Sequence, residues 1–137
     1  MVFGLSPLCS ASIIYSNSVL AKMYMSFGYR LSNPDGPKGD TAFENAHKAQ
    51  LNEAEWSPLL IAGLLCLHVK GDKGPCVAAG LAMFGSVWYV WSRILFAVKN
   101  GNPLVLPGGL ARYIGGVLIA LKLMTTLKSS TTCPVLQ

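Results

Sequence analysis

The chain has 137 residues, of which 52% are hydrophobic and only 12% are charged. A soluble domain normally carries ~25% charged residues, so this chain has too few to cover a surface that faces water. Its net charge of +5 is spread along the sequence rather than clustered, which argues against nucleic acid as a partner. The cysteines show no spacing typical of a metal site or a disulfide framework. We therefore expect one integral membrane domain over residues 1–137.

The first apolar segment, residues 8–28, predicts a membrane helix of mixed polarity. Serines, Asn17 and Lys22 interrupt it, so its polar side is expected to pack against other helices rather than face lipid. A segment rich in Pro, Gly and Asn predicts a loop at residues 29–40. The second helix is predicted at residues 41–69, where a polar first half runs into an apolar second half without a turn signal.

A short polar turn at residues 68–74 leads to the third helix, which is predicted at residues 75–99. A second Pro/Gly loop follows at residues 100–109. The fourth helix is predicted at residues 110–127, with its paired glycines as a point of close helix contact. The fold class is thus an all-α, multi-pass membrane protein with a bundle of four transmembrane helices. The two long loops hold slightly more Lys and Arg than the opposite ends, which places them on the cytoplasm-like face.

The second helix carries a polar stripe into the apolar layer. At ~100° per residue, Lys48, Asn52 and Glu55 lie on one helical face. An ionisable group at membrane depth costs ~2.5–3.5 kcal/mol on insertion scales, so such groups usually face a bundle interior or a wet cavity. Arg93 of the third helix lies at a similar depth, and a Glu55–Arg93 ion pair would offset the desolvation of both charges.

Three interpretations of this stripe remain open. In the first, the stripe is the polar start of a helix, and Lys48 pairs with Glu44 in solvent. In the second, Glu55 and Arg93 form a structural ion pair that fixes the helix register. In the third, these side chains line a charged pocket for a small zwitterionic ligand.

These residues resemble the MAPEG family, the membrane-associated proteins in eicosanoid and glutathione metabolism, and in particular the microsomal glutathione S-transferases. Lys48, Asn52, Glu55 and Pro58 stand at the spacing of the family's second-helix signature. Arg93, followed by an isoleucine, matches the start of the third-helix signature. The resemblance implies a homotrimer of four-helix bundles in the endoplasmic reticulum or another organelle membrane. It also implies that glutathione binds between neighbouring subunits near the cytoplasmic face.

The resemblance assigns binding roles by position. Lys48 would meet a glutathione carboxylate, and Asn52 and Glu55 would hold polar and amino groups of the tripeptide. Arg93 would brace the site. These residue types suit glutathione, an anionic tripeptide that also carries one ammonium group.

The departures from the family concern the catalytic positions. Phe96 and Asn100 stand where family members usually show Tyr or His and Tyr. Gly109 stands where an Arg thought to stabilise the glutathione thiolate is expected. Arg112 and Tyr89 are the nearest replacements, although neither is in register.

Two functions are therefore weighed. The first is a membrane-bound glutathione transferase or peroxidase acting on lipophilic electrophiles or lipid hydroperoxides, which the set Lys48, Asn52, Glu55 and Arg93 favours. The second is a non-catalytic, structural or lipid-presenting subunit of a larger membrane complex, which the missing Tyr and Arg favour. In that case Arg112 serves only to reach the membrane interface from the end of its helix. A channel or transporter is disfavoured because no broken helix is visible.

Overall fold

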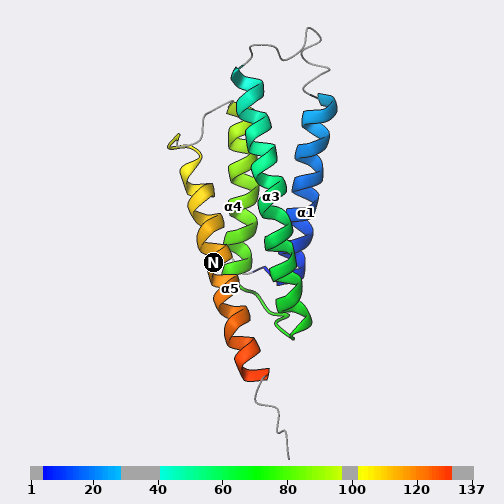
Figure 1. Cartoon of the computed structure of the whole chain (residues 1–137), viewed down its shortest axis with the longest axis vertical. Coiled ribbons are helices and arrows are strands. Elements are labelled where there is room, and N and C mark those ends of the chain that lie inside the picture. Colours follow the sequence, from blue (N-terminus) through cyan, green and yellow to red (C-terminus); the bar gives the residue numbers. More distant parts are fainter. Residues whose placement is uncertain (1–4, 29–40, 97–101, 131–137) are drawn as a thin grey trace, which may run out of the picture.

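The computed structural model describes residues 5–28, 41–96 and 102–130. Four long helices form an elongated bundle, and a short π-helix extends the first of them (Figure 1). In chain order the elements are α1 (Pro7–Met23), η1 (Tyr24–Gly28), α3 (Thr41–Val69), α4 (Val77–Phe96) and α5 (Leu106–Ser130). Within the described ranges the fold is all-helical apart from an isolated bridge between Leu5 and Cys76.

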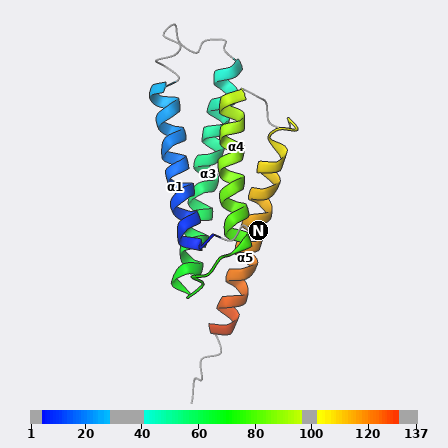
Figure 2. The same cartoon turned by 180° about the vertical axis from the view of Figure 1, so that it is seen from behind.

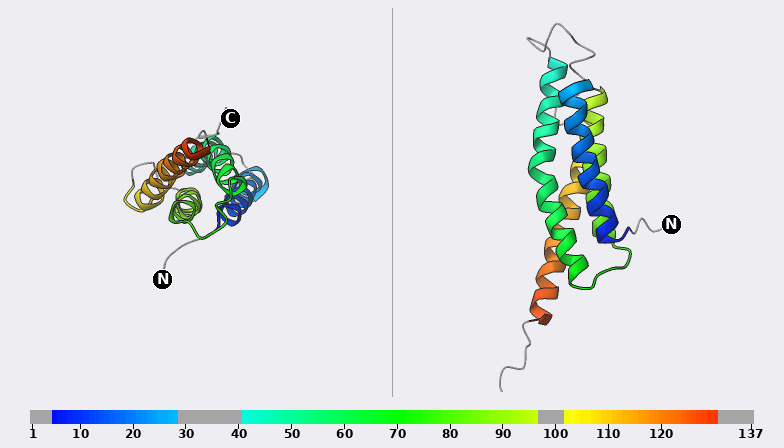
Figure 3. Two further views of the ribbon diagram at one scale, coloured as in Figure 1. Left: turned by 90° about the horizontal axis from the view of Figure 1, so that it is seen from below. Right: turned by 90° about the vertical axis from the view of Figure 1, so that its right-hand side faces the viewer.

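Helix α4 contacts each of the other three long helices, and α5 packs mainly against α4 and less against α3. The view from behind shows α1 and α5 on opposite sides of the bundle (Figure 2). We call the end where α3 and α5 begin the loop end, and the end where α3 turns into α4 the turn end. Helix α5 continues past the other helices at the turn end (Figure 3).

Local sequence explains two helix boundaries. Ser6 caps α1, because its Oγ accepts a hydrogen bond from the backbone N–H of Cys9 at 3.2 Å. Helix α3 ends before Gly71, whose φ of 98° lies in the left-handed region that favours glycine. There the N–H of Asp72 returns to the carbonyl of Leu67 at 3.1 Å, which satisfies a carbonyl at the helix end.

The predicted positions of the first three helices are confirmed to within two residues wherever their ends are described. The fourth helix, in contrast, begins about one turn before residue 110, at Leu106. Asn102 starts this turn, since its Oδ1 accepts from the N–H of Leu104 and its carbonyl accepts from Val105, both at 2.9 Å. Pro107 then falls in the first helical turn, where no N–H is needed and proline is tolerated.

Helices α4 and α5 approach each other through glycines. A Cβ at Gly85 of α4 would lie 2.3 Å from the backbone nitrogen of Arg112, and a Cβ at Gly115 would lie 2.5 Å from that of Ala82. Close contacts between small residues are typical of helices that pack in membranes. The predicted contact at Gly115 is thus confirmed. The Gly85 contact holds the backbone of Arg112 against α4 inside the bundle.

Two helices, Val77–Phe96 and Leu106–Thr126, are long and apolar enough to cross a membrane. The other two predicted spans, α1 and α3, do not meet this test within the described residues. Helix α3 has 29 residues. Its length of ~43 Å exceeds the ~30 Å hydrocarbon core of a bilayer.

We expect Gly85→Ala to destabilise the bundle, because the added methyl group would overlap the Arg112 backbone and such overpacking typically costs ~1–3 kcal/mol. Gly116→Ala is the matched control. Its Cβ would meet Leu60 and Trp56 at 3.5 Å, an ordinary contact, and Ala favours a helix over Gly by up to ~1 kcal/mol. Thermal unfolding in mild detergent compares the two. Equal melting temperatures would contradict the close contact.

Candidate functional site

A buried ion pair joins α3 to α5. Arg112 Nη1 donates to Glu53 Oε2 at 3.1 Å, and both side chains are only 1% exposed. Nη2 of Arg112 donates to Asn52 Oδ1. The guanidinium carbon lies 4.1 Å from the ring centroid of Tyr89 and 5.3 Å from that of Trp56. One cation on α5 therefore contacts both α3 and α4.

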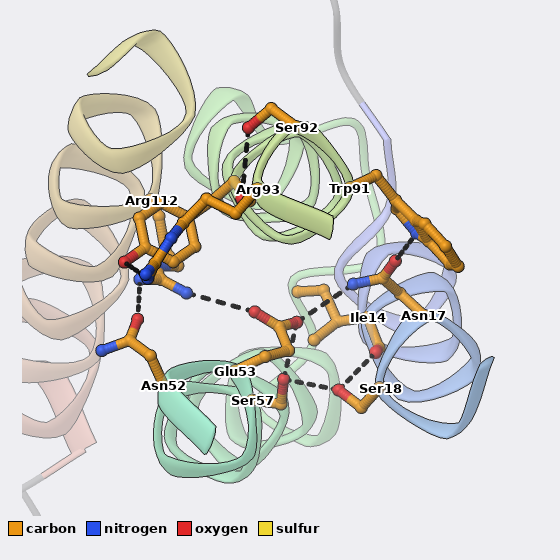
Figure 4. A network of polar contacts seen from close by, with 11 residues as sticks. Ile14, Asn17, Ser18, Asn52, Glu53, Ser57, Trp91, Ser92, Arg93 and Arg112 are labelled. Carbon is orange, nitrogen blue, oxygen red and sulfur yellow. Dashed lines mark hydrogen bonds and ion pairs between the residues drawn. The ribbon is translucent and has the colours of Figure 1, made fainter. Parts of the chain in front are cut away.

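The other carboxylate oxygen of Glu53 extends the network to α1 and α4. Oε1 accepts from Ser57 Oγ at 2.8 Å and from Asn17 Nδ2 at 3.1 Å. Asn17 Oδ1 in turn accepts from Trp91 Nε1 at 2.7 Å, and Ser18 Oγ bonds to Ser57 Oγ at 2.6 Å. Figure 4 shows these side chains converging on Glu53 from the surrounding helices. A buried charge is tolerated only when its partners satisfy it in this way.

The predicted Glu55–Arg93 ion pair is wrong. Glu55 is exposed, and the buried carboxylate of α3 is Glu53. Two residues turn a helix by ~200°, so these two side chains point in nearly opposite directions. The missed signal is the apolar stripe of the second half of α3. Followed backwards from Leu60 at helical spacing, it passes through Ser57 to Glu53.

For a non-catalytic protein, the sequence predicted that Arg112 reaches out to the membrane interface. This prediction is wrong. The Arg112 side chain is turned inward, where Glu53 neutralises its charge. The reason is the glycine contact at Gly85, which places the Arg112 backbone on the inner side of α5.

Arg93 is also buried, at 4% exposure, but it has no carboxylate partner among the described residues. Its Nη1 donates to the Tyr89 hydroxyl at 3.0 Å, and its Nε has no hydrogen-bond partner in this part of the chain. The carboxylates of the described ranges are engaged or exposed elsewhere: Glu44 pairs with Lys48, Glu53 with Arg112 and Asp72 with Lys122, while Glu55 is exposed. The described interior thus holds two guanidinium groups and one carboxylate.

The other residues predicted for the site are less central. Lys48 is exposed, and its Nζ lies 3.6 Å from Oε2 of Glu44, one helical turn away. This agrees with the interpretation in which Lys48 pairs with Glu44 in solvent. Two positions at which the sequence departs from the family pattern were not predicted as site residues. Phe96 is exposed at the last residue of α4, and Asn100 lies outside the described residues.

A cavity of about 180 Å³ opens beside the buried cluster, between α3, α4 and α5. Asn52, Tyr89, Gly109 and Tyr113 line it, together with apolar residues from the start of α5. A Cβ at Gly109 would meet only the Tyr89 ring, at 3.8 Å or more, so the position is open to a side chain. Sequence reasoning had singled out Asn52, Tyr89 and Gly109 separately, and the fold brings them together.

The described residues form a helical bundle with a buried polar centre, and two of its helices are long and apolar enough to cross a membrane. Comparison with known proteins then gives the family: the sequence model of the MAPEG family matches residues 6–99, which is more than half of the chain. The chain belongs to the MAPEG family. The matched region includes Glu53, Tyr89 and Arg93 but ends before Arg112. No curated protein and no solved structure matches the chain at a significant level.

We expect Glu53→Gln to destabilise the protein by ~3–5 kcal/mol, because it leaves Arg112 buried without a counter-charge. Glu55→Gln, the same change two residues away, should leave stability nearly unchanged because Glu55 is exposed. The unfolding free energy in detergent measures both.

Adding Arg112→Gln to Glu53→Gln should recover part of the loss, since no unpaired charge then remains. An equal loss for the Glu53 and Glu55 variants would contradict the buried pair.

Proposed function

We propose that the protein is a membrane-bound glutathione transferase or peroxidase that binds glutathione beside Arg93 and acts on lipophilic electrophiles or lipid hydroperoxides. The observation that carries the proposal is an excess of buried positive charge among the described residues, where Glu53 is the one buried carboxylate beside Arg93 and Arg112. A buried guanidinium without a counter-charge is costly, and an anionic ligand would lower that cost. Membership of the MAPEG family supports glutathione as this anion.

The cavity has room for only one end of glutathione. The cavity volume of about 180 Å³ is below the ~300–1,000 Å³ of typical small-molecule pockets, so it would enclose only part of the tripeptide. The remainder would lie along the outer stripe of α3, where Lys48 and Glu55 are exposed and offer one charge of each sign. A homotrimer, in which a neighbouring subunit covers this stripe, is part of the proposal.

Tyr89 is the residue best placed to stabilise a thiolate. Its hydroxyl oxygen accepts a hydrogen bond from Arg93, which leaves its own O–H hydrogen for a ligand in the cavity that it lines. Bound glutathione would supply a thiol, and stabilisation matters because an ordinary thiol, with a pKa of ~8.5, is mostly protonated at neutral pH. The hydrogen bond from Arg93 to the Tyr89 oxygen makes the Tyr89 hydroxyl a stronger donor to such a ligand.

Specific observations also favour the alternative, a non-catalytic MAPEG protein that serves as a structural or lipid-presenting subunit of a larger membrane complex. Gly109 brings no cation into the cavity, and the charge of Arg112 is already neutralised by Glu53. Under this alternative, glutathione binds without forming a thiolate, or does not bind at all. The two functions therefore differ in a measurable property of the bound thiol.

Tyr89→Phe tests the proposed role of the hydroxyl. We expect glutathione affinity to stay nearly unchanged and turnover of a hydrophobic electrophile to fall by ~10²-fold or more, the loss typical when one preorganised donor to an anion is removed. Ultraviolet absorbance of the bound thiolate should fall in parallel. Tyr113→Phe is the control, because Tyr113 lines the same cavity but its ring packs on Trp56. Wild-type protein that binds glutathione without any thiolate signal would contradict catalysis and support the alternative.

Gly109→Arg tests whether the cavity can use an added cation. The Cβ fits beside Tyr89, so we expect the thiolate signal to rise and turnover to increase by ~10-fold or more. Gly108→Arg is the control, because its Cβ would lie 2.7 Å from the backbone nitrogen of Tyr89 and should disturb the bundle. A folded Gly109→Arg protein with an unchanged thiolate signal would contradict this use of the cavity.

A further inference from the structure

A cysteine and a lysine meet at the turn end of the bundle. Cys76 stands directly before α4 and is buried, at 6% exposure. Lys122 comes from α5, and its Nζ donates a hydrogen bond to Cys76 Sγ at 3.6 Å. Ten residues of α5 separate Lys122 from Arg112, a rise of ~15 Å along the helix. The pair therefore lies outside the candidate site.

An acidic residue completes the group. Asp72, in the turn between α3 and α4, forms an ion pair through Oδ2 with Lys122 Nζ, so this nitrogen contacts a carboxylate and a sulfur at once. The side chains of Lys122 and Asp72 are 42% and 26% exposed. Cys76, in contrast, packs in the apolar cluster that includes Ala79 and Ile119. Water and small solutes therefore reach the sulfur from the side of the ion pair.

The backbone fixes the sulfur, and the amine is the mobile partner. The N–H of Cys76 donates to the carbonyl of Leu5 at 3.1 Å, and its carbonyl accepts from the N–H of Gly80, also at 3.1 Å. The amine of Lys122, in contrast, stands at the end of a flexible four-carbon stem. Rotation about the bonds of this stem brings Nζ closer to Sγ without movement of the helices. An amine and an oxidisable sulfur are thus within reach of one new bond.

The geometry points to an oxidative modification site, in which Cys76 Sγ and Lys122 Nζ become joined by a nitrogen–sulfur bond when hydrogen peroxide oxidises the thiol. The product is a sulfenamide, the linkage that forms when a nitrogen captures a cysteine sulfenic acid. This modification does not depend on the proposed glutathione chemistry, because its residues belong neither to the cavity nor to the Glu53 network.

The bond forms in two balanced steps. Hydrogen peroxide first transfers an oxygen atom to the Cys76 thiol, which gives a sulfenic acid and water; the sulfur loses two electrons, and the O–O bond of the peroxide is reduced. The ammonium of Lys122 then passes a proton to the Asp72 carboxylate, and the free amine attacks the sulfur. The S–N bond forms, the S–O bond breaks, and the hydroxyl leaves as water with a second proton from the nitrogen.

An added thiol reverses the link. A first thiol attacks the sulfur and releases the amine of Lys122, and a second one restores the Cys76 thiol as the two added thiols become a disulfide. The modification is therefore reversible, unlike oxidation of the same sulfur to a sulfinic acid.

The other cysteines of the described ranges lack this arrangement. Cys9 and Cys66 are exposed, and neither thiol is hydrogen-bonded to a lysine within this part of the chain. A sulfenic acid at either position has no amine beside it, so further peroxide converts it to a sulfinic acid. These two residues are therefore internal controls in the same protein.

The link also changes the stability of the bundle. It joins the start of α4 to α5 and closes a loop over residues 76–122. As with a disulfide, closure of a loop restricts the unfolded chain and so favours the folded one. Peroxide should therefore strengthen the α4–α5 contact at the turn end.

Peptide mapping tests the link directly. The protein in lipid nanodiscs is treated with hydrogen peroxide, the remaining thiols are alkylated, and tryptic peptides are identified by mass spectrometry. We expect a peptide pair joined through Cys76 and Lys122, lighter by two hydrogen atoms than the separate peptides and absent after treatment with a thiol. Cys66 should appear as the sulfinic acid.

Three outcomes of this mapping would overturn the proposal. The first is a Cys76 that remains a thiol in peroxide, and the second is a Cys76 that becomes a sulfinic acid without a joined peptide. The third is a joined pair that retains an oxygen atom, which would contradict a direct nitrogen–sulfur bond.

Lys122→Arg is the matched variant, because arginine keeps a positive charge beside Asp72 but its guanidinium stays protonated and is a poor nucleophile. It should abolish the joined peptide and leave Cys76 to become the sulfinic acid. Lys73→Arg, at an exposed position of the same turn, should leave the link unchanged. A joined peptide that persists in Lys122→Arg would assign the link to another amine and overturn the site.

Thermal unfolding gives a second readout. The change in melting temperature that peroxide causes should be more positive, by several degrees, for the wild type than for Lys122→Arg. A thiol added after the peroxide should remove this difference. Equal changes for the two proteins would overturn the stabilising effect of the link.

Discussion

Two charges buried in an apolar bundle cost more free energy than their attraction returns, unless further hydrogen bonds satisfy both groups. Glu53 and Arg112 meet this condition. Glu53 accepts hydrogen bonds from Ser57 and Asn17, and Arg112 contacts Asn52 and lies over the Tyr89 ring. Because the pair and its partners together come from all four long helices, the register of each helix depends on the pair. The polar side of α1, which would be unfavourable in lipid, is explained by the same network.

The Glu53–Arg112 pair also determines which buried charge remains for a ligand. With Arg112 neutralised by Glu53, the charge of Arg93 is left without a described carboxylate and is directed at Tyr89. The close α4–α5 contact at Gly85 keeps both guanidinium groups near the same ring. A structural ion pair and a ligand site, which sequence reasoning treated as alternatives, are therefore compatible. Glu53 and Arg112 join α3 to α5, while Tyr89, which accepts a hydrogen bond from Arg93, lines the adjoining cavity.

The helices were predictable from sequence because their apolar runs and turn signals are local properties. The first turn of α5 was missed because Pro107 suggested a loop, although proline is compatible with a helix start. The buried face of the first half of α3 was not predictable from periodicity, since Lys48, Asn52, Glu53 and Glu55 place polar groups on every side. Which of them is buried depends on the packing of α1 and α5, and that information lies in distant residues such as Asn17 and Arg112.

Among the described residues, the buried guanidinium groups exceed the buried carboxylates by one, and we propose that an anionic ligand supplies the missing negative charge. Calorimetric titration of the protein in nanodiscs, with glutathione and with its dimethyl ester, tests this proposal because the ester lacks both carboxylates. A hydrogen bond to a charged group is worth ~1.5–3 kcal/mol, so glutathione should bind ~10- to 100-fold more tightly than the ester. Equal affinity for the two compounds, or no binding of either, would contradict the account.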